Sequence, residues 1–175
     1  GNTPVNLYQA MIEGYGRGEL DFSGVRTFNL DEYVGLDRTH PQSYFHFMKV
    51  NLFDHVNLKP EHIHFLSGLP KDVEQHCEEY EGMIVAAGGI DVQVLGLGRV
   101  GHIGFNEPTS SLRSRTRDKT LTRETIADNR ARYGGAAMPL GRLGRQACFG
   151  GEGVEPDSAL SFAQVAEYGV WLRHR

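Results

Sequence analysis

Two short segments of the chain carry side chains of the kinds that transfer protons in enzymes. His102 and Glu107 lie five residues apart on a glycine-flanked stretch, and Asp31 and Glu32 follow a short β-branched and aromatic segment at 25–28. Imidazole and carboxylate groups can donate and accept protons, so His102 and Glu107 are candidates for general acid-base catalysis, and Asp31 lies just beyond a strand end. On residue types alone, a surface histidine and a solvated glutamate explain the first pair equally well.

The elements that must position these residues follow from hydrophobic periodicity. Apolar residues recur every three or four positions at 4–16, 43–52 and 72–88, which predicts helices, and strands are expected at 25–28, 63–66 and 91–98. The stretch 158–171 could also be helical. This alternation predicts an α/β fold with an open, mostly parallel sheet flanked by helices. Ligands of such sheets bind at the carboxyl ends of the strands, where Asp31 and the His102 segment would both lie.

Composition narrows the class of protein further. The 175 residues fit one domain, and a formal net charge of -4 gives no electrostatic reason to expect nucleic acid as a partner. The chain has no apolar run of membrane-spanning length and no signal-peptide pattern at its start, so we expect a cytoplasmic protein with no membrane partner. Cys77 and Cys148 are too few for a disulfide framework, and Cys77 lies on an apolar helical stripe.

Two weaker motifs are better explained without a cofactor. Residues 96–101 match the G-x-G-x-x-G pattern of dinucleotide-binding proteins, but Gly104 and Pro108 interrupt the helix that this pattern should open. His62 and His64 form an alternating pair that lacks a third ligand close by in the sequence. We therefore expect neither a metal ion nor an organic cofactor.

Three longer segments, 27–36, 101–108 and 114–121, resemble glucosamine-6-phosphate deaminases, also called glucosamine-6-phosphate isomerases. The resemblance covers residues 1 to about 130 in one register. It implies the Rossmann-like fold of the sugar-phosphate isomerases. It also implies an aldose-ketose isomerisation with hydrolytic loss of the amino group, from glucosamine 6-phosphate and water to fructose 6-phosphate and ammonia, in the catabolism of N-acetylglucosamine.

The same resemblance implies a role for each candidate residue. Asp31 would be the general base that moves a proton between C2 and C1 of the open-chain amino sugar. His102 would transfer the proton of the ring oxygen during pyranose opening, and Glu107 would orient its imidazole. The groups that bind the sugar phosphate would be Gly1, Asn2, Thr3 and Arg132, with Arg130 as an alternative to Arg132 because the register slips there.

A second, regulatory site is also implied by the resemblance. Some family members bind N-acetylglucosamine 6-phosphate at a subunit boundary, which would make this chain allosteric and a homo-oligomer. The matching residues here are Ser110, Arg117, Lys119 and Thr120. The alternative is that these side chains form a solvated basic face.

The chain departs from the family pattern in two places. Val100 stands where the family commonly has an aspartate that assists ring opening, and Arg99 precedes it. Residues 134–175 are glycine-rich and resemble nothing in the family, so we expect a partial sugar-phosphate domain at 1–133 and a divergent tail at 134–175 that is poorly ordered or frameshifted. On this interpretation the family fold is truncated at both ends.

These departures leave two alternatives to the deaminase. One is a non-catalytic remnant that binds sugar phosphates without releasing ammonia. The other is a related sugar-phosphate lactonase, which would use a loop histidine to activate water. The segment 29–33, Asn-Leu-Asp-Glu-Tyr, favours the deaminase.

Overall fold

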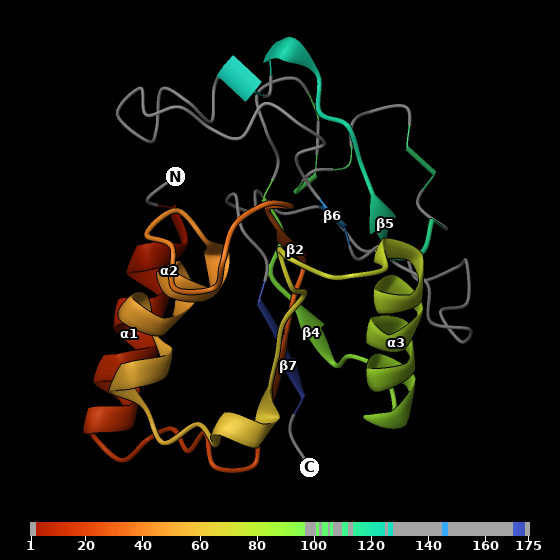
Figure 1. Ribbon diagram of the computed structural model, residues 1–175. Helices are drawn as coiled ribbons and strands as arrows, with labels where there is room; N and C mark the ends of the chain where they lie inside the picture. Colours follow the sequence, from red (N-terminus) through yellow and green to blue (C-terminus); the bar gives the residue numbers. More distant parts are fainter. Residues whose placement is uncertain are drawn as a thin grey trace.

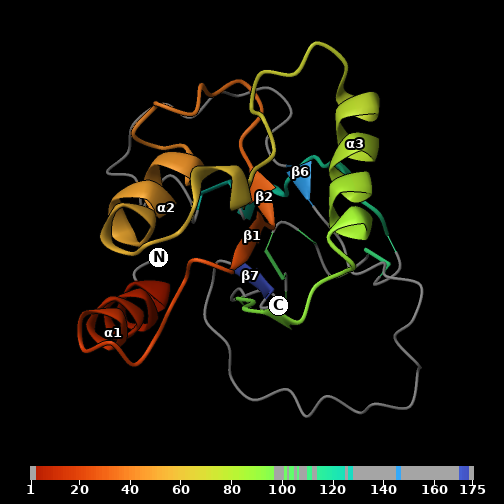
Figure 2. The ribbon, with the colours of Figure 1, turned by 90° about the horizontal axis from the view of Figure 1, so that it is seen from below.

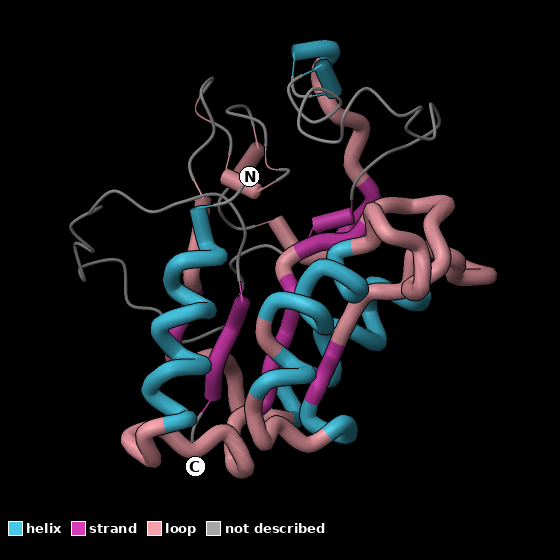
Figure 3. The backbone as a smooth tube through the Cα atoms, turned by 90° about the vertical axis from the view of Figure 1, so that its left-hand side faces the viewer, coloured by secondary structure: helices cyan, strands magenta, loops and turns pink. Residues whose placement is uncertain are grey.

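The computed structural model describes residues 3–96, 101, 103–104, 106, 110–111, 114–124, 126–127, 145–146 and 170–173. Helices α1 and α2 lie on one side of a central layer of strands, and α3 lies on the other side (Figure 1 and Figure 2). The helices span Thr3–Gly16 (α1), Tyr44–Asn51 (α2) and Val73–Ala86 (α3), with short 3₁₀ turns at Phe53–His55 and Pro60–His62. The strands run alongside these helices (Figure 3). This layered arrangement confirms the predicted α/β class.

The strands form two small sheets. They are β1 (Arg26–Asn29), β2 (Asp31–Glu32), β3 (Ile63–His64), β4 (Val92–Gln93), β5 (Arg117–Asp118), β6 (Arg145–Gln146) and β7 (Val170–Arg173). The larger sheet has the order β3-β1-β7-β4, with β3 parallel to β1 and β7 antiparallel to both β1 and β4. Thus β3, β1 and β4 run in one direction and β7 runs against them. The smaller sheet has the order β2-β6-β5 with antiparallel pairs.

Strand β7 corrects one expectation from the sequence. A helix at 158–171 is wrong at its end, because Val170 and Trp171 belong to β7 and pair with Asn29 and Phe28 of β1. Valine and tryptophan are favoured in strands, and a place between β1 and β4 supplies them with a hydrogen-bonding neighbour on either side. Residues 158–169 lie outside the described part. The division of the chain at residue 133 stays a prediction.

Side chains at the helix ends explain where the helices begin and stop. Ser43 accepts a hydrogen bond from the His46 amide at the start of α2, and Asp72 accepts one from the Gln75 amide at the start of α3. After α3, Gly88 and Gly89 adopt positive φ angles of 85° and 89°. Glycine tolerates that conformation, so the helix ends there. In the part of the chain that the structure describes, no helix is long and apolar enough to cross a lipid bilayer.

The two faces of β1 are each covered by a hydrophobic cluster. One cluster lies against α1 and α2 and contains Tyr8, Phe22, Val25, Met48, Leu52, Phe53 and Leu58. The other lies against α3 and contains Phe28, Leu30, Leu66, Tyr80 and Ala87. Strand β1 is therefore buried on both faces, as is usual for strands of an α/β sheet. Cys77 of α3 is also buried, which confirms its interpretation as a core residue.

Candidate functional site

Asp31 is a buried carboxyl group at the end of a central strand. It begins β2, two residues after β1 ends at Asn29, and its side chain is 6 % exposed. Removal from water, with a further contribution from the negative charge of Glu32, raises the pKa of Asp31 well above its usual range. A carboxylate with a raised pKa is a stronger base, which suits proton abstraction from carbon near neutral pH.

Glu32 fixes the strand that carries Asp31. Its Oε1 accepts hydrogen bonds from the Tyr33 amide at 2.9 Å and the Tyr44 amide at 3.0 Å. Its Oε2 accepts from the Ser43 hydroxyl at 3.0 Å and the Phe45 amide at 3.1 Å. Burial raises the pKa of Glu32, and these hydrogen bonds oppose that rise. The carboxyl group therefore ties β2 to the amino-terminal turn of α2, whose amides are otherwise without helical partners.

Tyr80 of α3 holds the end of β1 from the opposite face. Its hydroxyl donates to the Asn29 carbonyl at 2.7 Å and lies 3.4 Å from the His64 carbonyl at the end of β3. The side chain is fully buried. Burial raises the pKa of Tyr80, and the negative charges of Asp31 and Glu81 raise it further. Tyr80 is thus a neutral donor that keeps two parallel strand ends together beside Asp31.

The histidine pair of the sequence lies next to these strand ends. His64 stacks on Phe28 with ring centroids 4.4 Å apart. Burial lowers the pKa of His64, and the nearby positive charges of Arg26 and His62 lower it further. Among the described residues, no three His, Cys, Asp or Glu side chains lie close enough together to hold a metal ion. His64 therefore belongs to the packing of the sheet, and His62 lies in the 3₁₀ turn before β3.

The turn that follows β2 depends on close backbone contact with Gly68. The Gly35 amide donates to the Gly68 carbonyl at 2.7 Å, and Gly35 itself has a φ of 100°. A Cβ atom at position 68 would lie 2.1 Å from the Leu36 carbonyl oxygen and 2.5 Å from that of Tyr33. Only glycine fits at position 68, so the path of the chain leaving the Asp31 strand is set by backbone contact.

The loop after β4 contains the second group of candidates. His102 and Glu107 lie outside the described residues. Asn106, between them, is buried, and its amide and carbonyl both bond to Ile103 at 2.8 and 3.0 Å. The Arg117 guanidinium donates to the Asn106 side-chain oxygen at 3.0 Å. The described part of this loop is therefore fixed by β5, which begins at Arg117.

The residues assigned to phosphate binding are described only in part. Gly1, Asn2 and Arg132 lie outside the described residues, and Thr3 begins α1. The amino-terminal end of α1 lies at the same end of the molecule as β2, β5 and β6 (Figure 1). A helix amino terminus attracts anions through its unpaired amides and its dipole, so its position suits a phosphate group near Asp31.

The residues assigned to regulation differ in their surroundings. Arg117 is half-buried and hydrogen-bonded, Lys119 is half-buried and Thr120 is exposed. The Ser110 hydroxyl oxygen is buried and has no hydrogen-bond partner among the residues that the structure describes. A ligand site formed by Ser110, Arg117, Lys119 and Thr120 stays a prediction.

Sequence reasoning missed three contributions to this site. Glu32 as an anchor, Gly68 as a contact of the turn and Tyr80 as a clamp were not predicted. The serine cap at position 43 was the available signal for the first, because a helix start twelve residues after a glutamate allows a contact between them. Gly68 and Tyr80 contact residues far away in the sequence, and no local pattern indicates either contact.

Comparison with known proteins gives one sequence family. The sequence profile described as glucosamine-6-phosphate isomerases/6-phosphogluconolactonase matches residues 1–127. A protein of Bacillus subtilis (strain 168) named glucosamine-6-phosphate deaminase 2 is 52 % identical over 143 residues, which are 82 % of this chain and 57 % of that protein. The glucosamine-6-phosphate deaminase of Hahella chejuensis is 57 % identical over 129 residues, or 74 % of this chain and 49 % of its own. The chain thus spans about half the length of the curated relatives it matches.

Solved structures agree with the sequence comparison. A monomeric glucosamine-6-phosphate deaminase superposes with a TM-score of 0.78 and 37 % identity, covering 85 % of this chain and 61 % of that one. The 6-phosphogluconolactonase of Thermotoga maritima superposes with a TM-score of 0.55 and 21 % identity, over 85 % of this chain and 60 % of its own. The second likeness is one of fold alone.

Proposed function

Because this chain belongs to the family of glucosamine-6-phosphate isomerases and 6-phosphogluconolactonases, we propose that it converts glucosamine 6-phosphate and water to fructose 6-phosphate and ammonia. The observation that carries the proposal is Asp31, a buried carboxyl group with a raised pKa at the end of a central strand. Relatives more than half identical to this chain bear the name of the deaminase, which favours this activity over the lactonase.

Asp31 is the base of the proposed isomerisation. In the open-chain amino sugar it takes the proton from C2 and returns it to C1, while one proton passes from the amino nitrogen to O1, so that C1 becomes a hydroxymethyl group and C2 becomes an imine. Addition of water to C2 then releases ammonia and leaves the ketone of fructose 6-phosphate. General acid-base assistance of this kind contributes about 10²- to 10⁴-fold to a rate.

The remaining roles are assigned by the family motif. His102 transfers the proton of the ring oxygen when the pyranose opens, and Glu107 orients the imidazole. Val100 occupies the place of the family's assisting aspartate, so His102 and Glu107 carry ring opening without it. Valine neither accepts nor donates a proton, and opening is therefore the step that we expect to be slowest in this chain.

Binding of the phosphate is assigned to the start of α1. Amides and a hydroxyl of Gly1, Asn2 and Thr3 meet the phosphate oxygens, and Arg132 supplies a positive charge. Regulation is assigned to Ser110, Arg117, Lys119 and Thr120, which bind N-acetylglucosamine 6-phosphate in a homo-oligomer. The Arg117 guanidinium, held by the Asn106 side chain and the Arg115 carbonyl, would supply a positive charge for the anion.

Val100 favours one second candidate. It stands where the family commonly has an aspartate, so a sugar-phosphate-binding protein without turnover is the alternative. It predicts that glucosamine 6-phosphate raises the melting temperature while no ammonia forms. The deaminase predicts both effects.

The test is formation of ammonia and fructose 6-phosphate from glucosamine 6-phosphate, with Asp31→Asn as the matched variant. Asparagine keeps the shape of aspartate and cannot act as the base, so we expect turnover to fall by about 10²- to 10⁴-fold while the ligand-induced thermal shift remains. Equal turnover in the wild type and the variant would remove Asp31 from the mechanism. Binding without turnover in the wild type would favour the alternative.

A further inference from the structure

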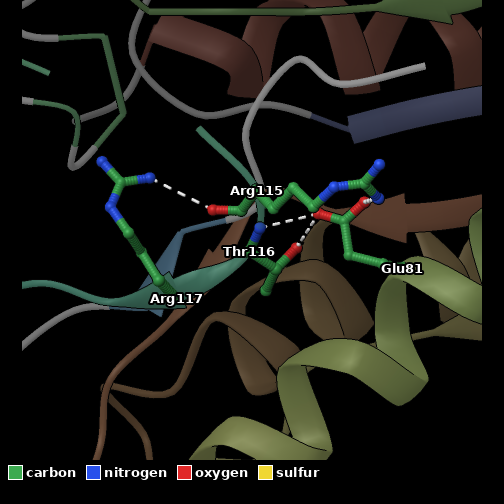
Figure 4. A network of polar contacts seen from close by, with 4 residues as sticks. All are labelled: Glu81, Arg115, Thr116 and Arg117. Atoms are coloured by element: carbon green, nitrogen blue, oxygen red, sulfur yellow. Dashed lines mark hydrogen bonds and ion pairs between the residues drawn. The ribbon is translucent and has the colours of Figure 1, made fainter. Parts of the chain in front are cut away.

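Glu81 is a buried glutamate of α3 that the proposed mechanism does not use. It is 9 % exposed, and its Oε1 accepts hydrogen bonds from both the amide and the hydroxyl of Thr116, at 2.6 and 2.7 Å (Figure 4). Its Oε2 lies 3.8 Å from the Arg115 guanidinium. A buried carboxylate is costly unless polar partners compensate it. The position of Glu81 therefore depends on the segment 115–117, and the position of that segment depends on Glu81.

Segment 115–117 in turn holds the loop after β4. Arg117 folds back to donate to the Arg115 carbonyl at 3.1 Å and reaches the Asn106 side-chain oxygen at 3.0 Å (Figure 4 shows the first contact). Asn106 is buried, and its backbone pairs with Ile103. A continuous series of hydrogen bonds thus runs from Glu81 through this segment to Asn106, the neighbour of Glu107 in the sequence.

The residue before Glu81 contacts the opposite side of the site. Tyr80 donates to the Asn29 carbonyl, two residues before Asp31. Tyr80 and Glu81, which are consecutive residues of α3, therefore bond to two different parts of the site. Tyr80 bonds to the strand end before Asp31, and Glu81 bonds to segment 115–117, which holds Asn106. An α-helix is rigid over one turn, so α3 fixes the separation of the two.

We propose that Glu81 is a positioning residue that sets the distance between Asp31 and Asn106 by holding segment 115–117 against α3. The catalytic consequence rests on the proposed deaminase function, whereas the effect on the loop is measurable without turnover. A misplacement of about 1 Å can lower a rate about 10²-fold even when the altered residue is far from the reacting atoms.

The expected kinetic signature separates positioning from binding. The phosphate is assigned to the start of α1, which is on the other side of the strands from α3 (Figure 2). Loss of the Glu81 contacts should therefore lower kcat about tenfold or more and change KM by less than about twofold. A role confined to stability would lower the melting temperature and leave kcat of the folded enzyme unchanged.

The variants follow from the atoms involved. Glu81→Leu removes the acceptor, whereas Glu81→Gln keeps a carbonyl oxygen that can accept both hydrogen bonds from Thr116. Thr116→Val removes the hydroxyl, and Thr116→Ser keeps it. Glu78→Leu is the control, because Glu78 is exposed and lies one turn earlier on α3.

Two measurements on the full chain decide the proposal. Amide hydrogen exchange is followed at Thr116 and Asn106, and kcat and KM are measured with glucosamine 6-phosphate. We expect Glu81→Leu to lose about ten- to hundredfold of protection at Thr116, the range for a hydrogen bond to a charged group, and to lose protection at Asn106 as well. Glu81→Gln should restore protection and kcat, and Glu78→Leu should match the wild type.

Several outcomes would overturn the proposal. One is loss of protection at Thr116 with Asn106 unchanged, which would make Glu81 a local contact. A second is an unchanged kcat in folded Glu81→Leu. A third is a loss of kcat in Glu78→Leu that equals the loss in Glu81→Leu. If Glu81→Leu does not fold, Thr116→Val against Thr116→Ser decides by the same criteria. If the wild type shows no turnover, the proposed function fails, and exchange at Asn106 alone decides the positioning role.

Discussion

Glu32 and Glu81 are both buried glutamates that accept hydrogen bonds from backbone amides, and they anchor the site from opposite sides of the strands. Both oxygens of Glu32 are used, by the amides of Tyr33, Tyr44 and Phe45 and the Ser43 hydroxyl. Glu81 receives both bonds from Thr116 on one oxygen, and its other oxygen faces an Arg115 side chain that is 62 % exposed.

The two anchors also differ in the length of chain that they close. The partners of Glu32 lie within 13 residues, whereas Thr116 lies 35 residues from Glu81. The first anchor joins a strand to the next helix and is reinforced by the cap of that helix. The second holds a distant segment through one residue. We infer that the Asp31 side is the more rigid of the two.

Substitution of Glu32 by glutamine should have the largest effect on stability. The amide group of glutamine would point two N–H donors at the Ser43 hydroxyl and the Phe45 amide, which are donors themselves. Leaving buried donors without acceptors should lower the free energy of unfolding by about 3 kcal/mol. Urea denaturation measures this, with exposed Glu61→Gln as the control. Equal stability of the two variants would contradict the rigid anchor.

A methyl group at Gly68 should have the next largest effect. Gly68→Ala places a Cβ atom 2.1 Å from the Leu36 carbonyl oxygen, so the turn after β2 must move. Strain of this kind costs about 2 kcal/mol. Exposed Gly82→Ala on α3 meets nothing within 4 Å and should be neutral or stabilising. Thermal unfolding of both variants checks the prediction. An unchanged melting temperature in Gly68→Ala would show that the turn after β2 can move at little cost.

The pH dependence of stability should be altered by Asp31→Asn. Burial raises the pKa of Asp31 above its unfolded value, so the folded state binds its proton more tightly. The stability due to this group is present below the unfolded pKa and is lost as pH rises through the folded pKa. Asp31→Asn should therefore be more stable than the wild type at neutral pH and closer to it below about pH 4. Urea midpoints measured between these limits test the sign, and a less stable variant at neutral pH would reverse it.

The smallest effect is expected from Arg115→Ala. The Arg115 guanidinium lies 3.8 Å from Glu81 and is largely exposed, so solvent screens the ion pair. Its loss should change the free energy of unfolding by no more than about 0.5 kcal/mol. If Arg115→Ala lowered the free energy of unfolding as much as Glu81→Leu does, Glu81 would act mainly through Arg115, and its hydrogen bonds to Thr116 would be secondary.

The sequence alone was sufficient for the local parts of this structure. Helices α1, α2 and α3 were predicted from apolar periodicity, because amphipathicity depends on residues a few positions apart. The strand before Asp31 was predicted for the same reason. The structure places Asp31 two residues after that strand ends and buries it, and its role as a base stays a prediction.

Long-range contacts could not be predicted in this way. The antiparallel entry of β7 between β1 and β4, the Tyr80 clamp and the bond between Glu81 and Thr116 each join residues far apart in sequence. Their residue types are ordinary for a strand or a helix and carry no sign of the partner. Strand β2 was missed because two residues give no period, and its pairing with β6 is what defines it.

The central position of β7 has a consequence for how the protein is made. Arg26 of β1 pairs with Arg173, so one ladder of the larger sheet joins residues far apart in the sequence. A ribosome releases β1, β3 and β4 well before β7, and until then β1 and β4 lack the neighbour that lies between them. Nascent chains would therefore hold an open gap in the sheet, where other strands can pair. The larger sheet should therefore be completed only after β7 has left the ribosome, and slowly, as is usual for sheets with such distant pairings.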